Sequence, residues 1–269
     1  MQRFLILCLA TVLSVSALAV DARAHWDEGD DHKMHWAQLP DPNGWDITVA
    51  IDDFRCTASG PITDIHFWVS WKDDQVNWSA INNIELYLTT DVPAVQGPYA
   101  YSTPGDSLWN YNTFTNGYTY RLAGEGDQGW YQPQQPRQVI TSDHEKYYQV
   151  NVSIPEDDRY NQTAGTIYWL GVAFYMETGS EGLVGWKTTT DDLHWMDYAV
   201  YPHSFGGGQF EYRLLEPETD QFVDMAFVIV PEPTSLALLA LGGLVLVRRR
   251  SAAKPCREHA LMLHSAGAG

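Results

Sequence analysis

The sequence predicts an all-β fold, a two-sheet β-sandwich of jelly-roll type, and three observations support this prediction. The 11 Trp, 15 Tyr and 9 Phe supply strand-forming side chains, while 21 Gly and 14 Pro supply turns. Several short segments alternate apolar and polar residues with the period of two that is typical of a half-buried strand. No stretch of the central chain shows a helical repeat over three turns. With 269 residues, 45% of them hydrophobic, the chain can bury a sizeable core.

The clearest strand covers residues 62–71. Its apolar residues Ile65, Phe67, Val69 and Trp71 alternate with Asp64, His66, Trp68 and Ser70, so the two sets should face opposite sides of a sheet. The residues around Leu86 repeat the pattern. Residues 91–116, rich in Pro and Gly, are predicted to form a long loop that carries aromatic side chains. Further strands are expected at residues 47–54, 117–122, 146–154, 166–176, 183–188, 196–201, 209–214 and 222–230.

Residues 1–24 are predicted to be a secretory signal peptide. Arg3 precedes an apolar run over residues 4–19, and small-residue cleavage sites follow at Ala17-Leu18-Ala19 and Ala22-Arg23-Ala24. We therefore expect export through the inner membrane, cleavage by signal peptidase and a mature chain that starts at Val20 or His25. Residues 25–229 are expected to form a single secreted domain.

The C-terminal region has a defined order of features. Val230, Pro231, Glu232 and Pro233 precede twelve apolar or glycine residues (236–247), and Arg248, Arg249 and Arg250 follow. Twelve residues form a hydrophobic helix shorter than the roughly 20 residues of a stable membrane span, and the arginines favour the cytoplasmic side. The alternative is an ordinary short membrane anchor.

Residues 230–250 resemble the PEP-CTERM sorting signal of Gram-negative bacteria. The resemblance implies transient anchoring in the membrane, cleavage by an exosortase-type membrane protease, and a final place at the cell surface or outside the cell. Residues 251–269 form a polar tail, which such signals usually lack.

A second resemblance covers most of the mature chain. The segments concerned include residues 36–45 (WAQLPDPNGW), 52–71 (DDFRCTASGPITDIHFWVSW) and 165–170 (GTIYWL). Together with shorter matches, they resemble a domain of unknown function that recurs in exported proteins of planctomycete-type bacteria. This resemblance implies a secreted β-rich module, and it transfers no catalytic residue.

The charge of the chain bears on its possible ligands, and its cysteine content bears on disulfide bonds. The chain has 34 acidic and 16 basic residues, a net charge of -18, so its field repels nucleic acid. Only Asp21, Glu232 and Glu258 of the acids lie outside the central domain, which is therefore more acidic than the whole. Cys56 is the single cysteine of this domain, so it should fold without an internal disulfide.

Two pairs of acids are candidate calcium ligands: Asp52 with Asp53, and Asp191 with Asp192. Carboxylates at strand ends or turns can enclose Ca²⁺, and both pairs flank sequences shared with the resembled domain. The alternative is that such acids only bond nearby backbone N–H groups at turns. The His-rich segment 25–36 is a further metal candidate, with a flexible acidic arm as its alternative.

Aromatic residues give the strongest prediction of a ligand. Trp68, Trp130 and Tyr131 are expected on a polar face or in loops, where rings can stack on the apolar faces of sugars. The alternative is a second core formed by these rings. Residues with the same expected placement are Trp78, Trp109, Tyr111, Tyr118 and Tyr120.

The predicted function is therefore that of a non-catalytic, exported cell-envelope or extracellular-matrix protein that binds an extracellular polysaccharide. The sequence has no Gly-x-Ser-x-Gly elbow and no glycine-rich phosphate loop, and no carboxylate pair stands out for glycoside hydrolysis. One alternative is a secreted carbohydrate-active enzyme, a hydrolase or an oxidase. Another is a purely structural matrix component.

Overall fold

The computed structural model describes residues 40–47, 50–97, 99–132, 138–179, 182–189, 197–201, 212–213 and 222–231. The chain divides into two units, Met1–Glu232 and Pro233–Gly269, and all described residues lie in the first. Several predictions fall outside the described residues: the signal peptide, the segment 25–36, Asp191, Asp192, Glu232, Pro233 and the three arginines. Within the described ranges, no helix is long and apolar enough to span a bilayer.

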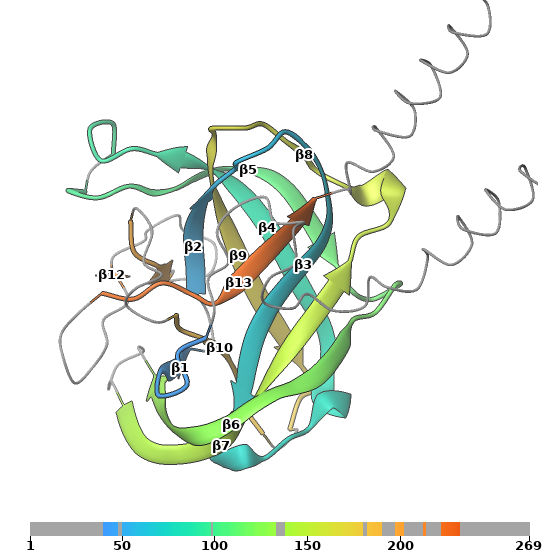
Figure 1. Cartoon of the computed structure of the whole chain (residues 1–269), viewed down its shortest axis with the longest axis vertical. Coiled ribbons are helices and arrows are strands. Elements are labelled where there is room, and N and C mark those ends of the chain that lie inside the picture. The colour runs from blue at the N-terminus through green and yellow to red at the C-terminus, as the bar shows by residue number, and fades with distance from the viewer. Residues whose placement is uncertain are drawn as a thin grey trace, which may run out of the picture. The chain divides into compact units, whose positions relative to one another are not determined.

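Two β-sheets pack together, which confirms the predicted two-sheet architecture (Figure 1). Three short 3₁₀ helices, η1 (Lys72–Asp74), η2 (Trp78–Ala80) and η3 (Glu156–Asp158), lie in the connections. The seven-stranded sheet has the order β10 (Val184–Lys187), β1 (Trp45–Ile47), β6 (Thr119–Gln132), β7 (Gln138–Ser153), β3 (Gly60–Trp71) and β13 (Phe227–Pro231), with β8 (Asn161–Gln162) also paired to β3. The six-stranded sheet has the order β12 (Tyr212–Arg213), β11 (Val200–Tyr201), β2 (Ala50–Arg55), β9 (Ile167–Met176), β4 (Ile81–Val92) and β5 (Thr103–Asn112).

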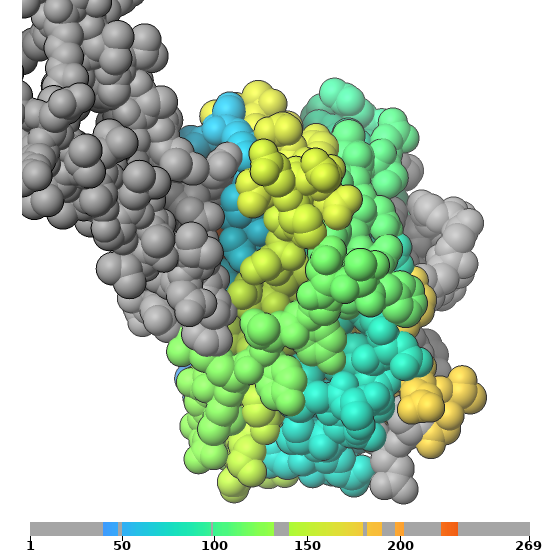
Figure 2. Space-filling view, turned by 90° about the vertical axis from the view of Figure 1, so that its right-hand side faces the viewer, coloured from blue at the N-terminus to red at the C-terminus, as the bar shows by residue number. Residues whose placement is uncertain are grey.

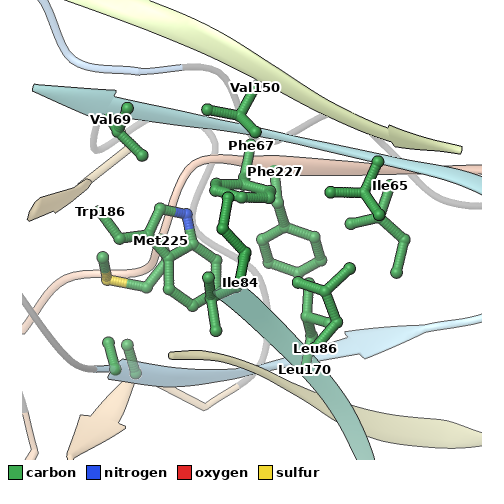
Figure 3. Close-up of a cluster of buried hydrophobic side chains, with 14 of the residues drawn as sticks. Ile65, Phe67, Val69, Ile84, Leu86, Val150, Leu170, Trp186, Met225 and Phe227 are labelled. Atoms are coloured by element: carbon green, nitrogen blue, oxygen red, sulfur yellow. The ribbon is translucent and has the colours of Figure 1, made fainter. Parts of the chain in front are cut away.

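The main core lies between the sheets (Figure 3). Phe67, Trp186 and Phe227 come from the seven-stranded sheet, and the Trp186 ring lies 6.4 Å from Phe67 and 5.8 Å from Phe227, edge to face in both cases. Leu86 and Leu170 oppose them from the six-stranded sheet. The alternation predicted for β3 is confirmed, because its apolar set joins this core while Trp68 belongs to a separate cluster.

The predicted loop over residues 91–116 is wrong. Strand β4 continues to Val92, and Thr103–Asn112 form β5, which pairs with β4. Strand β5 is the last strand of its sheet, where Pro104 and Gly105 are tolerated because one side of the strand needs no ladder hydrogen bonds. The composition of the segment therefore marks an edge strand.

The seven-stranded sheet curls back on itself. Strand β10 pairs with both β1 and β3, so the pairings β3–β7–β6–β1–β10–β3 form a closed cycle. Figure 1 shows β6 and β7 bending under β1 and β10. Three register shifts in β6 supply the bend. Gly129 allows β1 to approach, since a Cβ atom there would lie 2.0 Å from the Trp45 ring.

Candidate functional site

A group of polar side chains is enclosed by the closed strand cycle. It comprises Asp46 of β1, Gln128 of β6, His144 of β7 and Lys187 of β10, which we call the polar cluster. The neighbours Trp45, Ile47 and Trp186 belong to the main core, so Asp46 and Lys187 project from the opposite side of their strands. All four residues are buried, with exposed fractions between 0% and 2%.

Hydrogen bonds and charges connect the polar cluster around Asp46. The Nε2 atom of His144 lies 3.0 Å from Asp46 Oδ2, and its Nδ1 atom lies 2.9 Å from Asp143 Oδ2. The Nζ atom of Lys187 lies 3.4 Å from Asp46 Oδ1. This amine also donates to Gln128 Oε1 and to the backbone oxygen of Gly44. The carboxyl group of Asp46 is thus held between an imidazole and an amine.

Burial and charge act on the pKa values in this cluster in different ways. Burial lowers the pKa of Lys187, and the charge and hydrogen bond of Asp46 only partly oppose this effect. For His144, burial opposes protonation, but the hydrogen bonds and charges of Asp46 and Asp143 outweigh it and raise the pKa. The aromatic ring of Trp130 lies edge-on to His144 at 6.2 Å and adds to the dry surroundings.

Asp52 and Asp53 point to opposite faces of their strand. They are adjacent on β2, so their side chains project to opposite faces: Asp52 with Ala50 and Phe54 of the main core, and Asp53 with Ile51. Asp52 accepts the backbone N–H groups of Met225 at 2.7 Å and Asp53 at 3.0 Å. The two side chains therefore cannot contribute to one ion from the same face of β2, and calcium binding at either of them stays a prediction. Among the described residues, no group of three His, Cys, Asp or Glu side chains is arranged to hold a metal.

Each of these two carboxyl groups lies among other acids. Burial raises the pKa of Asp52, and the charges of Asp224 and Asp53 add to this effect. Burial also raises the pKa of Asp53, together with the charges of Asp224, Asp197 and Asp91. The backbone N–H of Asp197 only partly offsets the rise for Asp53, and neither carboxyl oxygen of Asp53 has a well-formed hydrogen bond to a described residue. The pKa of Asp53 is therefore raised from its ordinary value, which moves its titration toward neutral pH.

The three predicted sugar-binding residues are buried. Trp130 is 0% exposed inside the strand cycle, and Tyr131, 4% exposed, belongs to the main core. Trp68 faces away from the main core as predicted, but it packs against Ala226, Val228 and Tyr147 and is 4% exposed. The expectation that these rings are open to solvent is wrong, because the curled sheet and β13 cover positions that the sequence pattern leaves free.

A different aromatic group is accessible. Tyr120 of β6 is 47% exposed, and its ring stacks on Trp78 of η2 with 3.8 Å between centroids and 11° between planes. Tyr118 and Tyr148 complete this aromatic patch beside Trp78. Figure 2 shows the face concerned, where the green residues of β6 lie beside the turquoise residues that contain η2. The sequence predicts Trp78, Tyr118 and Tyr120 on polar faces or in loops, as it does for the three buried rings.

The patch contains hydroxyl groups that stay protonated at neutral pH. Burial raises the pKa of Tyr118 to about 12, and Tyr120 adds to this rise. Burial also raises the pKa of Tyr148, with contributions from Asp74 and Glu125. Tyr118 donates a hydrogen bond to the backbone oxygen of Trp78 at 3.3 Å, which holds the Tyr118 ring beside η2.

These features define a class: a mostly β protein with an enclosed polar cluster and an accessible aromatic patch. The comparisons with known proteins are more specific. The profile of the Domain of unknown function (DUF7901) matches residues 34–230, so the chain belongs to this family. The PEP-CTERM protein-sorting motif matches residues 230–251, which confirms the predicted signal and identifies an exported, exosortase-sorted protein of the cell surface. No curated protein and no solved structure matches the chain.

Sequence reasoning missed the polar cluster. Its four members are spread from Asp46 to Lys187, and only the strand pairing brings them together. One local signal was available: Lys187 stands in the strand Gly185-Trp186-Lys187-Thr188, where a charged residue on a buried strand requires a partner. The sequence does not say which residue that partner is.

Proposed function

We propose that this protein is a non-catalytic component of the cell envelope or extracellular matrix whose β-sandwich, of jelly-roll type, binds a polysaccharide through the aromatic patch. One observation carries the proposal: the Tyr120 ring is stacked on Trp78 yet 47% exposed. A supported flat ring open to solvent suits the apolar face of a sugar. The resemblance to domains exported by planctomycete-type bacteria supports the same setting.

The chemistry of the patch favours a neutral glycan. The chain carries a net charge of -18, which repels anionic polysaccharides at a distance. Next to the rings, Asp74 accepts the backbone N–H groups of Glu145 and Lys146. Glu125 is close enough to affect Tyr148, so the Glu125 carboxylate is the acceptor beside the patch for sugar hydroxyls. Leu122, 48% exposed and paired with Tyr148 across β6 and β7, extends the apolar surface.

An array of glycans, with an assay for released sugar, separates this proposal from its two alternatives. Binding without release of sugar is the expected result. Release of sugar would identify a carbohydrate-active hydrolase, and oxidised sugar an oxidase. Absence of both binding and release would leave a purely structural matrix component.

Processing is tested separately on protein recovered from the cell envelope. We expect an intact mass that lacks residues 1–24, after signal peptidase, and the residues beyond about 230, after the exosortase. The control is the full chain made in cells without an exosortase. A surface-exposed mature protein that retains Arg248 would contradict the proposed sorting.

A further inference from the structure

We propose that Lys187 and Asp46 condense to an intramolecular amide bond that covalently links strands β10 and β1. The two residues are direct partners in the antiparallel pairing of these strands. Both side chains are 0% exposed, and Nζ lies 3.4 Å from Oδ1, one bond away from the carboxyl carbon. The proposal goes beyond the function proposed above and does not depend on it.

The strand arrangement keeps the two reacting groups together. Directly opposed residues on neighbouring strands have Cβ atoms about 5 Å apart, so both side chains must fold toward each other inside the cycle. Gly185 leaves room for this arrangement, since a Cβ atom there would lie 2.8 Å from that of Asp46 and 2.9 Å from the Trp130 ring. The amine also lies 5.9 Å from the centre of the Tyr147 ring. Because the fold holds the amine and the carboxyl group next to each other, their reaction is effectively unimolecular.

The reaction balances without any other reactant. The ammonium of Lys187 and the carboxylate of Asp46 together contain the atoms of one amide and one water molecule. The ammonium of Lys187 gives one proton to Asp46 Oδ1, 3.4 Å away, while protonated His144 Nε2 donates a hydrogen bond to Oδ2 at 3.0 Å. The amine then attacks the carboxyl carbon, the carbon–nitrogen bond forms, and Oδ1 leaves as water with the second amine proton, so that Oδ2 becomes the amide oxygen. One amide hydrogen remains on Nζ.

The surroundings favour the amide over the ion pair. Two buried charges lose their hydration, and their mutual attraction offsets this desolvation penalty only when well-formed hydrogen bonds are also present. Asp46 Oδ2 lies 3.0 Å from His144 Nε2, but Oδ1 lies 3.4 Å from Lys187 Nζ, beyond the usual length of an N–H···O hydrogen bond. Condensation removes both charges. It would also give a cross-link to a surface domain in which Cys56 has no cysteine partner.

Tryptic digestion of the denatured full chain tests the proposal. Trypsin cleaves after Lys33, Arg55, Arg159 and Arg213, and an amide on Lys187 blocks cleavage there. The expected product is peptide 34–55 joined to peptide 160–213, with a mass one water below the sum of the two. Separate peptides 160–187 and 188–213 would overturn the proposal. A product with peptide 122–137, one ammonia below the sum, would assign the bond to Gln128 instead and would also overturn it.

Variants test the roles of the individual groups. Lys187→Met should give no joined peptide and a lower melting temperature, whereas the matched variant Lys146→Met should keep the joined peptide. His144→Phe, which removes the hydrogen bond to Asp46 Oδ2, should slow bond formation by about 100-fold or more, measured as the joined fraction over time after synthesis. A joined fraction that rises at the wild-type rate in folded His144→Phe protein would contradict the role of His144 as hydrogen-bond donor to the reacting carboxyl group.

Discussion

Asp46 and Asp53 are the same residue type, both are completely buried, and both project away from the main core, yet their surroundings are opposite. Asp46 lies between the amine of Lys187 and the imidazole of His144. Asp53 lies among Asp91, Asp197 and Asp224. The first carboxyl group is held by cations, and the second is driven toward its protonated form. Burial alone therefore does not determine what an acid does in this fold.

The largest expected effect comes from removing Asp46. In Asp46→Ala, the Lys187 amine remains buried and can form neither an ion pair nor the proposed amide, so the free energy of unfolding at neutral pH should fall by about 3 to 5 kcal/mol. Denaturant titration measures this. Asp106→Ala, at an exposed position, should change it by less than about 0.5 kcal/mol. A loss at Asp46 no larger than in this control would show that the polar cluster adds nothing to stability.

If calcium binds, it is expected to act on the surroundings of Asp53 and not on those of Asp46. Calcium binding at Asp52 and Asp53 stays a prediction from the sequence, and of these two acids only Asp53 has carboxyl oxygens without a well-formed hydrogen bond to a described residue. Binding to the folded state alone would stabilise it by about 2.7 kcal/mol at a hundredfold excess over Kd. Millimolar Ca²⁺ should then raise the Tm of the wild type but not of Asp53→Asn. Identical wild-type melts in Ca²⁺ and in chelator would exclude calcium.

The pH dependence of the free energy of unfolding gives a smaller effect that distinguishes the surroundings of Asp53 from those of Asp46. The raised pKa of Asp53 means that its contribution to stability is complete below the ordinary value of 3.8 and is lost as the pH rises through the raised pKa. Asp53→Asn carries no charge at any pH, so its free energy of unfolding at neutral pH should exceed that of the wild type. Unfolding measured from about pH 4 to pH 8 tests this, and Asp106→Asn is the control. An unchanged slope in Asp53→Asn would contradict the assignment.

The sequence predicted features that depend on local periodicity. The alternation along β3 correctly divided Phe67 from Trp68, because side chains of a strand alternate between its faces. The same rule, applied to Asp52 and Asp53, would have shown that the two carboxylates diverge. Edge strand β5 was missed because Pro104 and Gly105 usually mark a loop, although they are tolerated where one side of a strand is unpaired.

Features that depend on distant strand pairing could not be predicted. Trp130 follows glycine-rich sequence and has the local character of a turn residue, but the closed strand cycle buries it completely. Lys187 and Asp46 are 0% exposed for the same reason. Tyr120 shows the reverse, because it sits directly opposite the core residue Val150 on β7 and is nevertheless half exposed. Exposure in these cases is set by the curl of the sheet.

Binding of a neutral polysaccharide to Tyr120→Ala tests the central claim most directly. Trp78 lies under Tyr120, so tryptophan emission reports on the patch during a titration. We expect Tyr120→Ala to weaken binding by about 1 to 3 kcal/mol, a roughly 5- to 150-fold higher Kd, with little change in Tm. Tyr99→Ala, which removes a stacked tyrosine outside the patch, should bind like the wild type. Equal Kd values for Tyr120→Ala and the wild type would contradict the assignment of the aromatic patch as the glycan site.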